Sequence, residues 1–485
     1  MAKFTLSGPI ADLVEQVTSG QVSATQLVQT ALDRIAETED YHAILELNRY
    51  ALADAQAVDA RVAAGEKLPL AGIPFAAKDN FLTLGTHTTA ASHILETFTA
   101  PYEGPAIARL KAAGAVLVAK TNQDAFGHGG STENSDFGPT KNAHDPSRVP
   151  GGSSGGSTTA VALGQVCFAI GTDTGGSIRQ PSSLSGVVGL KVTYGLVPRT
   201  GVIAMASSTD TIGPMTNSVA DAGMVLDVLA GRDASDATSI ERNAGSYRIE
   251  ADTLADDLDG VKIGLIKEYL GEGLDAEVKA KLLAFVDSLK SRGATVETVS
   301  IPATERALAA YYILVPAEIS SNLARYDGIR YGHSAAAAAN LEETYFMSRD
   351  QGFGAEAKRR IMIGTYVLSS GYYDAYYKRA QKVRTKLVEE FDDAFAKYDY
   401  LVGPAAPTAA FPLGSKSGDP LAMYLEDVMT VAVSLVGAPA VVVPFASVGD
   451  GLPVGLQIIG RQKLEGALLQ VAAAVELAAA AGGQK

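Results

Sequence analysis

The chain has 485 residues, of which 47% are hydrophobic and 19% charged, and its formal net charge is −14. This composition is typical of a globular protein with a large buried core and excludes a disordered or disulfide-stapled chain, while the length allows roughly three average domains or one large α/β domain. The acidic balance excludes a global field that attracts nucleic acid, so such a contact requires a local patch or a partner subunit.

Residues 1–65 are predicted to be mainly helical. The segment SATQLVQTALDRIAET opens with a capping-box pattern, Ser23 and Gln26, and its apolar residues share one helical face. These apolar residues are Leu27, Ala31, Leu32 and Ile35. The N-terminal residues MAKFTLSGPIADLVEQV have no basic segment followed by an apolar core, so we expect a cytoplasmic protein without a secretory signal.

Further along, helix and strand patterns alternate. The segment IARLKAAG is followed by AVLVAK, and VDSLKSRG is followed by TVETVS. Gly114 and Gly293 stand where the two helices are predicted to stop. The helix, glycine, strand order predicts an α/β fold, and the two units resemble each other only in pattern.

Two stretches bear on the organisation of the second half. Residues 231–260 are polar and rich in helix breakers, and form either a seam between two halves or one long surface loop. Residues 428–446 carry no charge and approach membrane-spanning length, but Gly437, Pro439 and Pro444 argue against one continuous helix. We predict a core helix followed by the short buried strand AVVV, and no membrane contact.

Neither cysteine nor histidine chemistry is indicated. The single cysteine, Cys167, lies in the apolar segment VCFAI and is interpreted as a buried core residue. The six histidines follow no metal-binding or triad spacing, so we expect no metal site and interpret them as scattered surface or core side chains. They are His42, His87, His93, His128, His144 and His333.

The segment VPGGSSGGSTTAVALG, residues 149–164, raises three alternatives: a linker, a phosphate-binding loop or part of a catalytic site. Gly151 and Gly156 have the spacing of a phosphate-binding loop, but Ser157 stands where its lysine is required. A flexible linker is not expected directly before a helix of small residues. A catalytic role therefore remains to be tested against the rest of the chain.

A second glycine cluster, CFAIGTDTGGSIRQP, places Ser177 on a tight turn after an apolar strand. The backbone N–H groups of such a turn can stabilise an oxyanion, and here we assign them to Thr174, Gly175, Gly176 and Ser177. The α/β-hydrolase pattern G-x-S-x-G fails because Arg179 replaces its last glycine. A serine nucleophile without a histidine needs another base, and a desolvated lysine, Lys78 in GIPFAAKDN, is available.

These three motifs, around Lys78, Ser153 and Ser177, occur in the order and at the spacing of the amidase signature family, which the chain resembles. The resemblance implies that Ser177 is the nucleophile, that Ser153 is a bridging serine after a cis peptide bond, and that Lys78 is the base. It also implies one α/β/α domain over 1–485, with a large mixed sheet covered by helices on both faces. Within it, 1–65 would be the helical N-terminal part, 66–230 would carry the catalytic motifs, and 231–485 would complete the sheet and the substrate pocket.

Longer blocks resemble one branch of that family, the glutamine-hydrolysing A subunits of tRNA-dependent amidotransferases. These blocks include GSTENSDFGPTKN, SNLARYDGIRYG and GFGAEAKRRIMIGTYVLSSGYYDAYYKRAQKVR. The resemblance implies cofactor-free glutamine hydrolysis that supplies ammonia to a B subunit, which uses ATP and Mg²⁺ to convert Glu-tRNA(Gln) to Gln-tRNA(Gln), with a small C subunit in the complex. The alternatives are a free-standing amidase for another carboxamide and a catalytically silent assembly protein, the latter disfavoured by the intact triad.

The same resemblance points to Arg360 and Asp427 as the groups that bind the carboxylate and the ammonium of glutamine, with Tyr311 nearby. An arginine can bind a carboxylate through two hydrogen bonds, and an ammonium calls for a buried acid. Arg360 is expected to point inward because the helix around Met362 reads as core-facing. Lys358, Arg359 and Glu426 are interpreted as ordinary surface charges. In the sequence, Lys358 and Arg359 precede Arg360, and Glu426 precedes Asp427.

Departures from the family pattern occur at Val192, Ala405 and Ser434, where the family usually shows other residues. None of the three is a triad residue. The last two stand in segments expected near the substrate pocket, so they bear on substrate detail more than on the reaction.

Overall fold

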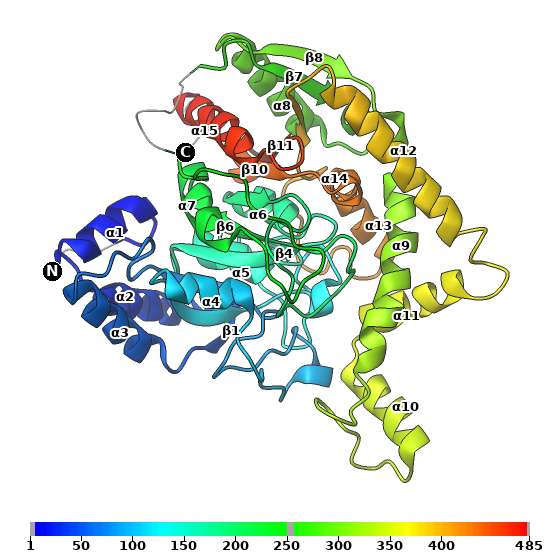
Figure 1. The fold of residues 1–485 in the computed structure, drawn as a ribbon. Coiled ribbons are helices and arrows are strands. Elements are labelled where there is room, and N and C mark those ends of the chain that lie inside the picture. Colours follow the sequence, from blue (N-terminus) through cyan, green and yellow to red (C-terminus); the bar gives the residue numbers. More distant parts are fainter. Residues whose placement is uncertain (1–4, 250–256, 483–485) are drawn as a thin grey trace.

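Eleven strands form one mixed sheet in the order β1-β3-β2-β4-β6-β5-β10-β11-β9-β7-β8 (Figure 1). The structure is a computed structural model that describes residues 5–249 and 257–482. The strands are β1 Ile44–Leu47, β2 Pro74–Lys78, β3 Val116–Thr121, β4 Phe168–Asp173, β5 Val188–Lys191, β6 Thr211–Thr216, β7 Lys262–Ile266, β8 Thr295–Val299, β9 Tyr400–Pro404, β10 Ala440–Val448 and β11 Leu452–Ile459. Strands β3, β2 and β4 run parallel, as do β8, β7 and β9, and the remaining pairs are antiparallel.

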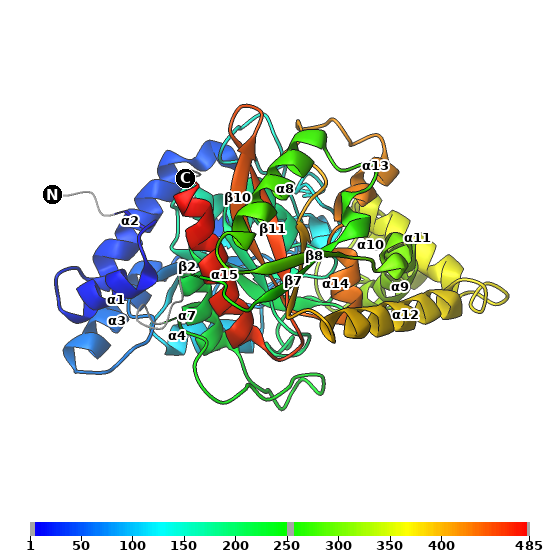
Figure 2. The same ribbon diagram turned by 90° about the horizontal axis from the view of Figure 1, so that it is seen from above.

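Helices surround this sheet, as the α/β prediction requires. The described α-helices are α1 Ile10–Thr18, α2 Ala24–Glu37, α3 Ala51–Ala63, α4 Pro105–Ala112, α5 Gly155–Ala162, α6 Arg179–Ser185, α7 Val219–Leu229, α8 Ala276–Lys290, α9 Ala307–Asn322, α10 Leu341–Gly352, α11 Ala355–Leu368, α12 Tyr377–Phe395, α13 Pro420–Tyr424, α14 Val431–Val436 and α15 Glu465–Ala481. Helices α5 and α6 contact each other and the central strands, while α7, α15 and α8 form a second contiguous group against β6, β5, β10 and β8 (Figure 2).

The local patterns form the elements that the sequence predicts. Helix α2 begins with a complete capping box, in which the Ser23 hydroxyl accepts from the Gln26 N–H and the Gln26 side chain accepts from the Ser23 N–H. Gly114 and Gly293 follow α4 and α8 with φ angles of +94° and +95°, a conformation that favours glycine. Each of these helices leads into a strand, β3 or β8, that pairs in parallel within the sheet.

The N-terminal part is mainly helical, as predicted, but it also contributes an edge strand. Residues Ile44–Leu47 form β1, which pairs antiparallel with β3 through Ile44 and Thr121, and Leu47 and Ala119. The segment ILEL is only four residues long, so it has too few residues to show a strand periodicity. Its pairing partner lies far away in the sequence, and tertiary contacts decide its conformation.

On the side of the molecule opposite α1, α2 and α3, helices α9 to α12 form a helical arm, and α9, α11 and α12 share a second apolar cluster with α14 and nearby strands (Figure 1). Helix α14 packs between this arm and the sheet, because it contacts both α9 and α12 and leads into β10. The uncharged run at 428–446 is therefore a short buried helix followed by a strand, as predicted. In the described part of the chain, no helix is both long and apolar enough to cross a membrane.

The predicted seam at 231–260 connects α7 to β7. Within it, residues 231–249 and 257–260 contain no helix or strand, and residues 250–256 lie outside the described residues. Strands from both sides of this connection join the same sheet, since β5 pairs with β10 through Lys191 and Ala440.

Candidate active site

The three sequence motifs meet at one edge of the sheet. Strand β2 ends at Lys78, and its parallel neighbour β4 ends at Asp173, directly before the turn that carries Ser177. The carboxyl ends of adjacent parallel strands share an edge, which is where α/β folds commonly place their sites. The loop before α5, with Ser153, completes the group, because the Ser154 N–H donates to the Ser177 carbonyl over 3.2 Å.

Lys78 contacts two serines of the glycine-rich segment. Its Nζ donates to Ser153 Oγ at 2.7 Å and to Ser154 Oγ at 3.0 Å, and the lysine is fully buried. Burial lowers the pKa of Lys78 to about 7, against the opposing pull of the nearby Asp124, Asp173 and Asp210 carboxylates. A substantial fraction of this amine is therefore neutral near pH 7 and able to accept a proton.

The Gly152–Ser153 peptide bond is cis. The Gly152 N–H donates to Gln180 Oε1 at 2.9 Å, and a side chain at this glycine would overlap the Asp124 carboxylate. Asp124 in turn accepts from the Thr132 N–H at 2.9 Å, so the segment is fixed from both sides. Burial raises the pKa of Asp124 to about 6.

The turn at 174–177 offers unpaired donors. None of its four backbone N–H groups donates to an acceptor among residues 5–249 and 257–482, and the Ser177 hydroxyl also has no partner there. Glycine is required by close approach: a Cβ at Gly175 would lie 2.5 Å from the Tyr311 hydroxyl, and one at Gly176 would overlap Thr430. Ser177 is 8% exposed. The turn can thus present a hydroxyl nucleophile beside donors for a developing oxyanion.

A buried ion pair supports this turn from behind. Arg179 donates to both Asp173 carboxylate oxygens, at 2.8 Å and 2.9 Å, and both side chains are fully buried. Burial by itself raises the pKa of Asp173, but the charge and hydrogen bonds of Arg179 outweigh this effect and hold the pKa below its usual value. The remaining Arg179 N–H groups donate to partners on later elements, Thr430 O, Gln457 Oε1 and Ser434 Oγ.

Comparison with known proteins shows the family of the chain. The profile of the family described as Amidase matches residues 26–469. The chain belongs to the amidase family. It is 53% identical to the A subunit of glutamyl-tRNA(Gln) amidotransferase from Koribacter versatilis, over 95% of this chain and 96% of that protein. It is 52% identical to the protein of the same name from Thermosynechococcus vestitus, over 96% of this chain and 97% of that protein.

Solved amidase structures share the fold. The crystal structure of the A subunit of glutamyl-tRNA(Gln) amidotransferase from Thermotoga maritima is 37% identical, with a TM-score of 0.79 over 97% of this chain and 94% of that chain. The peptide amidase of Stenotrophomonas maltophilia is 32% identical, with a TM-score of 0.80 over 96% of both chains. Proteins named for different substrates therefore share this architecture, so the substrate must be argued from the site of this amidase.

The residues assigned to glutamine binding form one cluster. Arg360 on α11 is buried, donates to Glu356 Oε1 at 2.8 Å and lies over the rings of Tyr312 and Tyr424, at 5.3 Å and 5.5 Å from their centroids. The Tyr312 hydroxyl donates to Asp427 Oδ2 at 2.9 Å. Burial raises the pKa of Asp427 to about 7.

Helix α9 connects this charged cluster to the candidate nucleophile. Tyr311 and Tyr312 are adjacent on α9, and the Tyr311 hydroxyl lies against Gly175 while Tyr312 contacts Asp427. A ligand at the turn of Ser177 therefore has a cation and an acid in the same neighbourhood. The sequence reasoning missed Tyr312, and no local signal distinguishes it from Tyr311.

Two predictions about the surroundings of Arg360 and Asp427 were wrong, one about the helix face of Met362 and one about the charge of Glu426. Met362 is 72% exposed, so the face of α11 that carries it does not face the core. Arg360 points inward because it shares the buried face of α11 with Ala357, Gly364 and Val367. Glu426 is not a surface charge: it is 2% exposed and paired with Lys416.

The prediction of surface charge is confirmed for Arg359 and Lys358. Their side chains are 42% and 40% exposed and pair with Glu356 and Asp350. Both residues lie on the same helix as Arg360, but their side chains are exposed, whereas the Arg360 guanidinium is buried.

The departures from the family pattern lie in the core around the site. Ser434 is buried and accepts a hydrogen bond from Arg179 at 2.8 Å, so it belongs to the support of the Ser177 turn. Val192 and Ala405 are fully buried, and their backbones pair with Lys191 and Gly455. None of the three contacts Lys78 or Ser153 through a hydrogen bond in the described part of the chain.

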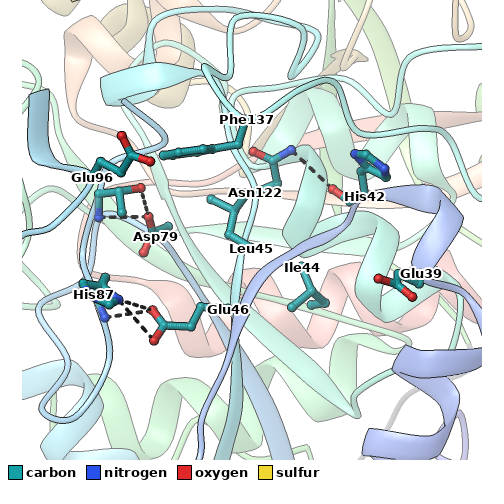
Figure 3. A pocket seen from close by; sticks show the side chains of 11 residues that line it. Glu39, His42, Ile44, Leu45, Glu46, Asp79, His87, Glu96, Asn122 and Phe137 are labelled. Carbon is teal, nitrogen blue, oxygen red and sulfur yellow. Dashed lines mark hydrogen bonds and ion pairs between the residues drawn. The ribbon is translucent and has the colours of Figure 1, made fainter. Parts of the chain in front are cut away.

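A second pocket, of about 520 Å³, is bordered by Asp79, the residue that directly follows Lys78 (Figure 3). It is lined by Glu39, His42, Ile44, Leu45, Glu46, Asp79, His87, Thr89, Glu96, Asn122 and Phe137. Several of its charges are already paired, Asp79 with Lys120 at 2.9 Å and Glu46 with His87 at 3.3 Å. Among the described residues no cluster of His, Cys, Asp and Glu is arranged to hold a metal ion, in this pocket or elsewhere.

Proposed function

We propose that this amidase is the glutamine-hydrolysing component of a tRNA-dependent amidotransferase. It would release ammonia for the conversion of Glu-tRNA(Gln) to Gln-tRNA(Gln). The observation that carries the proposal is the placement of a buried arginine and a buried acid, Arg360 and Asp427, against the same residue, Tyr312, next to the turn of Ser177. The names of the Koribacter and Thermosynechococcus relatives agree with it.

The proposed reaction uses Lys78, Ser153 and Ser177 as one proton relay. Neutral Lys78 takes a proton from Ser153, which takes one from Ser177, and Ser177 Oγ attacks the carboxamide carbon. The N–H groups of Thr174, Gly175, Gly176 and Ser177 stabilise the oxyanion. The carbon–nitrogen bond then breaks, the relay returns its proton to the departing ammonia, and water hydrolyses the acyl-enzyme to glutamate.

Charge complementarity selects glutamine among carboxamides. The Arg360 guanidinium would bind the α-carboxylate, and the Asp427 carboxylate would bind the α-ammonium, with Tyr311 beside the reacting amide. A carboxamide without these groups would form neither charged contact, so it would bind less tightly than glutamine.

Kinetics with two substrates test the proposal. Arg360→Ala and Asp427→Ala should each raise the KM for glutamine roughly 30-fold to 1,000-fold. This range corresponds to a loss of ~2–4 kcal/mol of interaction free energy. Hydrolysis of butyramide, which lacks both charged groups, should hardly change. Lys358→Ala is the matched control, because its side chain is exposed on the same helix and pairs with Asp350, whereas Arg360 pairs with Glu356, so both substrates should be unaffected.

Equal damage to both substrates by the Arg360 and Asp427 variants would contradict the glutamine assignment and favour the second candidate, a free-standing amidase. That candidate draws on the shared fold of the Stenotrophomonas peptide amidase. Its substrate would be a carboxamide without an amino-acid head group.

The same proposal covers the domain organisation, the compartment and the partner subunits of this chain. We propose that residues 1–485 act as one amidase domain, in the cytoplasm, with a B subunit that uses ATP and Mg²⁺ and a small C subunit. Glu-tRNA(Gln) would be bound through the complex, and glutamine hydrolysis by this chain would need no cofactor of its own.

A further inference from the structure

His128 is a buried imidazole for which the proposed reaction has no role. It is 0% exposed, and neither ring nitrogen has a hydrogen-bond partner among the described residues. Its backbone is fully paired, since its N–H donates to Ala125 O at 3.0 Å and its carbonyl accepts from Asn134 Nδ2 at 2.9 Å. A buried polar side chain without a partner destabilises the ligand-free protein, so its presence calls for a reason.

The segment that carries His128 runs along the candidate active site. A Cβ at the preceding residue, Gly127, would lie 3.5 Å from Ser153 Oγ, and one at Gly130 would lie 3.8 Å from Asp427 Oδ1. The carbonyl of Gly130 accepts from Gln180 Nε2 at 3.0 Å. The segment that carries His128 therefore runs from Ser153 to Asp427, the carboxylate assigned to the substrate ammonium.

The charge state of His128 suits a site beside an arginine. Burial lowers the pKa of His128 well below its ordinary value, and the positive charge of Arg360 lowers it further. The imidazole is neutral at pH 7, with one N–H donor and one acceptor nitrogen. A neutral donor can share a carboxylate with Arg360 without repelling the guanidinium.

We propose that His128 is a further substrate-binding residue, whose ring N–H donates a hydrogen bond to the α-carboxylate that Arg360 binds. This inference rests on the proposed glutaminase function. The substrate carboxylate would be the hydrogen-bond partner that the imidazole lacks in the ligand-free chain. His128 would in turn add a neutral contact to the charged contacts of Arg360 and Asp427. The unpaired ring destabilises the free protein, and the hydrogen bond to the substrate removes this destabilisation.

The first test is His128→Met, which keeps the volume and removes both nitrogens. We expect a KM for glutamine raised about 10-fold, the loss of roughly one hydrogen bond to a charged group. Butyramide hydrolysis should be unchanged, and the Tm without glutamine should equal or exceed that of the wild type, because a buried unpaired polar group is gone. The rise in Tm caused by glutamine should shrink.

Tyr247→Phe is the matched control. It also removes a polar atom from a buried side chain, the Tyr247 hydroxyl, but Tyr247 lies next to Asp227 and Arg242. It should leave the KM for glutamine unchanged. His128→Asn and His128→Gln place an amide near Nδ1 or Nε2, so partial recovery of the KM in one of them identifies the donor nitrogen.

A measurement on the unaltered histidine avoids dependence on folding of the variants. In Ser177→Ala labelled with ¹⁵N-histidine, saturating glutamine should shift the ring resonances of one buried, neutral histidine. An unchanged KM in a folded His128→Met variant, or unchanged ring resonances at saturating glutamine, would overturn the inference. A wild-type chain that fails to hydrolyse glutamine would instead overturn the proposed function, so the two failures are distinguishable.

Discussion

Lys78 illustrates how burial alone can turn an ordinary side chain into a base. Its Nζ contacts Ser153 and Ser154, and its pKa is lowered to about 7 by burial. If it acts in one relay with Ser153 and Ser177, removal of any member should stop proton transfer. We expect Lys78→Ala and Ser177→Ala to reduce ammonia release from glutamine on the order of 10³-fold or more, measured by a coupled ammonia assay.

Ser153→Ala should be severely impaired as well, because a water molecule would have to replace its hydroxyl in the relay. Ser157→Ala is the matched control within the same glycine-rich segment, since Ser157 Oγ bonds Thr121 Oγ1 at 2.6 Å and, in the described part of the chain, makes no hydrogen bond to Lys78. Its kcat should stay within a few-fold of the wild type. Near-normal activity of Ser177→Ala or Lys78→Ala would contradict the assigned roles.

The pH profile should follow the lysine. The active form of Lys78 is neutral and its pKa in the folded protein is about 7, so activity should rise as the pH increases through 7 and level off above it. Asp427 must be ionised to bind an ammonium, and its pKa is about 7. Activity toward glutamine should therefore fall more steeply below pH 7, because protonation of Asp427 adds to protonation of Lys78. Butyramide isolates the lysine, because it has no ammonium.

We therefore expect kcat/KM for butyramide, measured between about pH 5.5 and 9, to show one acid limb with an apparent pKa near 7. Asp427→Asn should leave that limb in place. A profile that is flat through this range, or that falls as the pH rises through 7, would show that a neutral Lys78 is not required.

At the scale of elements, the Ser177 turn depends on contacts that bring distant parts of the chain together. Arg179, at the start of α6, pairs with Asp173 at the end of β4 and also bonds Thr430, Ser434 and Gln457. Breaking a buried ion pair by removing one partner leaves an uncompensated charge. Arg179→Met should therefore lower the free energy of unfolding by ~3–5 kcal/mol in urea denaturation and also reduce kcat.

Lys290→Met supplies the comparison for that variant. It breaks the ion pair with Asp287, in which the side chains are 50% and 70% exposed, and it should change stability by less than about 1 kcal/mol. If Arg179→Met cost no more than Lys290→Met, the Asp173 and Arg179 pair would not be what fixes the turn.

How much of the site can be predicted from sequence depends on where its contacts originate. Lys78 and Ser177 stand at or just after the ends of predicted strands, where the local pattern singles them out as candidates, whereas Ser153 is assigned only through the resemblance to the amidase signature family. Tyr312 bonds Asp427 across 115 residues, and Arg179 bonds Gln457 across 278 residues, so no local pattern identifies them. Strand β1 was missed for the same reason, because its partner β3 lies far away in the chain.

The burial of single side chains is also decided by packing. On α11, the sequence predicts a core-facing helix around Met362 with Arg360 pointing inward, but only Arg360 is buried, because the face of α11 that packs against α9 carries Arg360 and leaves Met362 outside. Glu426 is buried because Lys416, from the preceding loop, pairs with it. The fold class, which depends on many alternating elements, is confirmed, whereas these single positions required the structure.

At the scale of the whole molecule, the net charge of −14 sets the expected behaviour toward tRNA. Attraction of a polyanion requires positive charges that displace its counterions, and an acidic surface repels it. The proposed complex therefore needs its tRNA contacts on another subunit. Glutamine hydrolysis by this chain alone should be measurable but weak, and faster when B and C subunits and Glu-tRNA(Gln) are added.

We expect the isolated chain to bind tRNA weakly, with no saturation at micromolar concentrations in about 0.15 M salt, measured by fluorescence anisotropy of labelled tRNA. Binding should become tight once the B subunit is added. The slope of log Kd against log salt should then report the phosphate contacts of the complex, and charge-reversing substitutions on the exposed Arg359 or Lys358 should hardly alter it. Tight, salt-sensitive binding of tRNA by this chain alone would contradict a division of labour in which an acidic amidase supplies ammonia and its partner holds the nucleic acid.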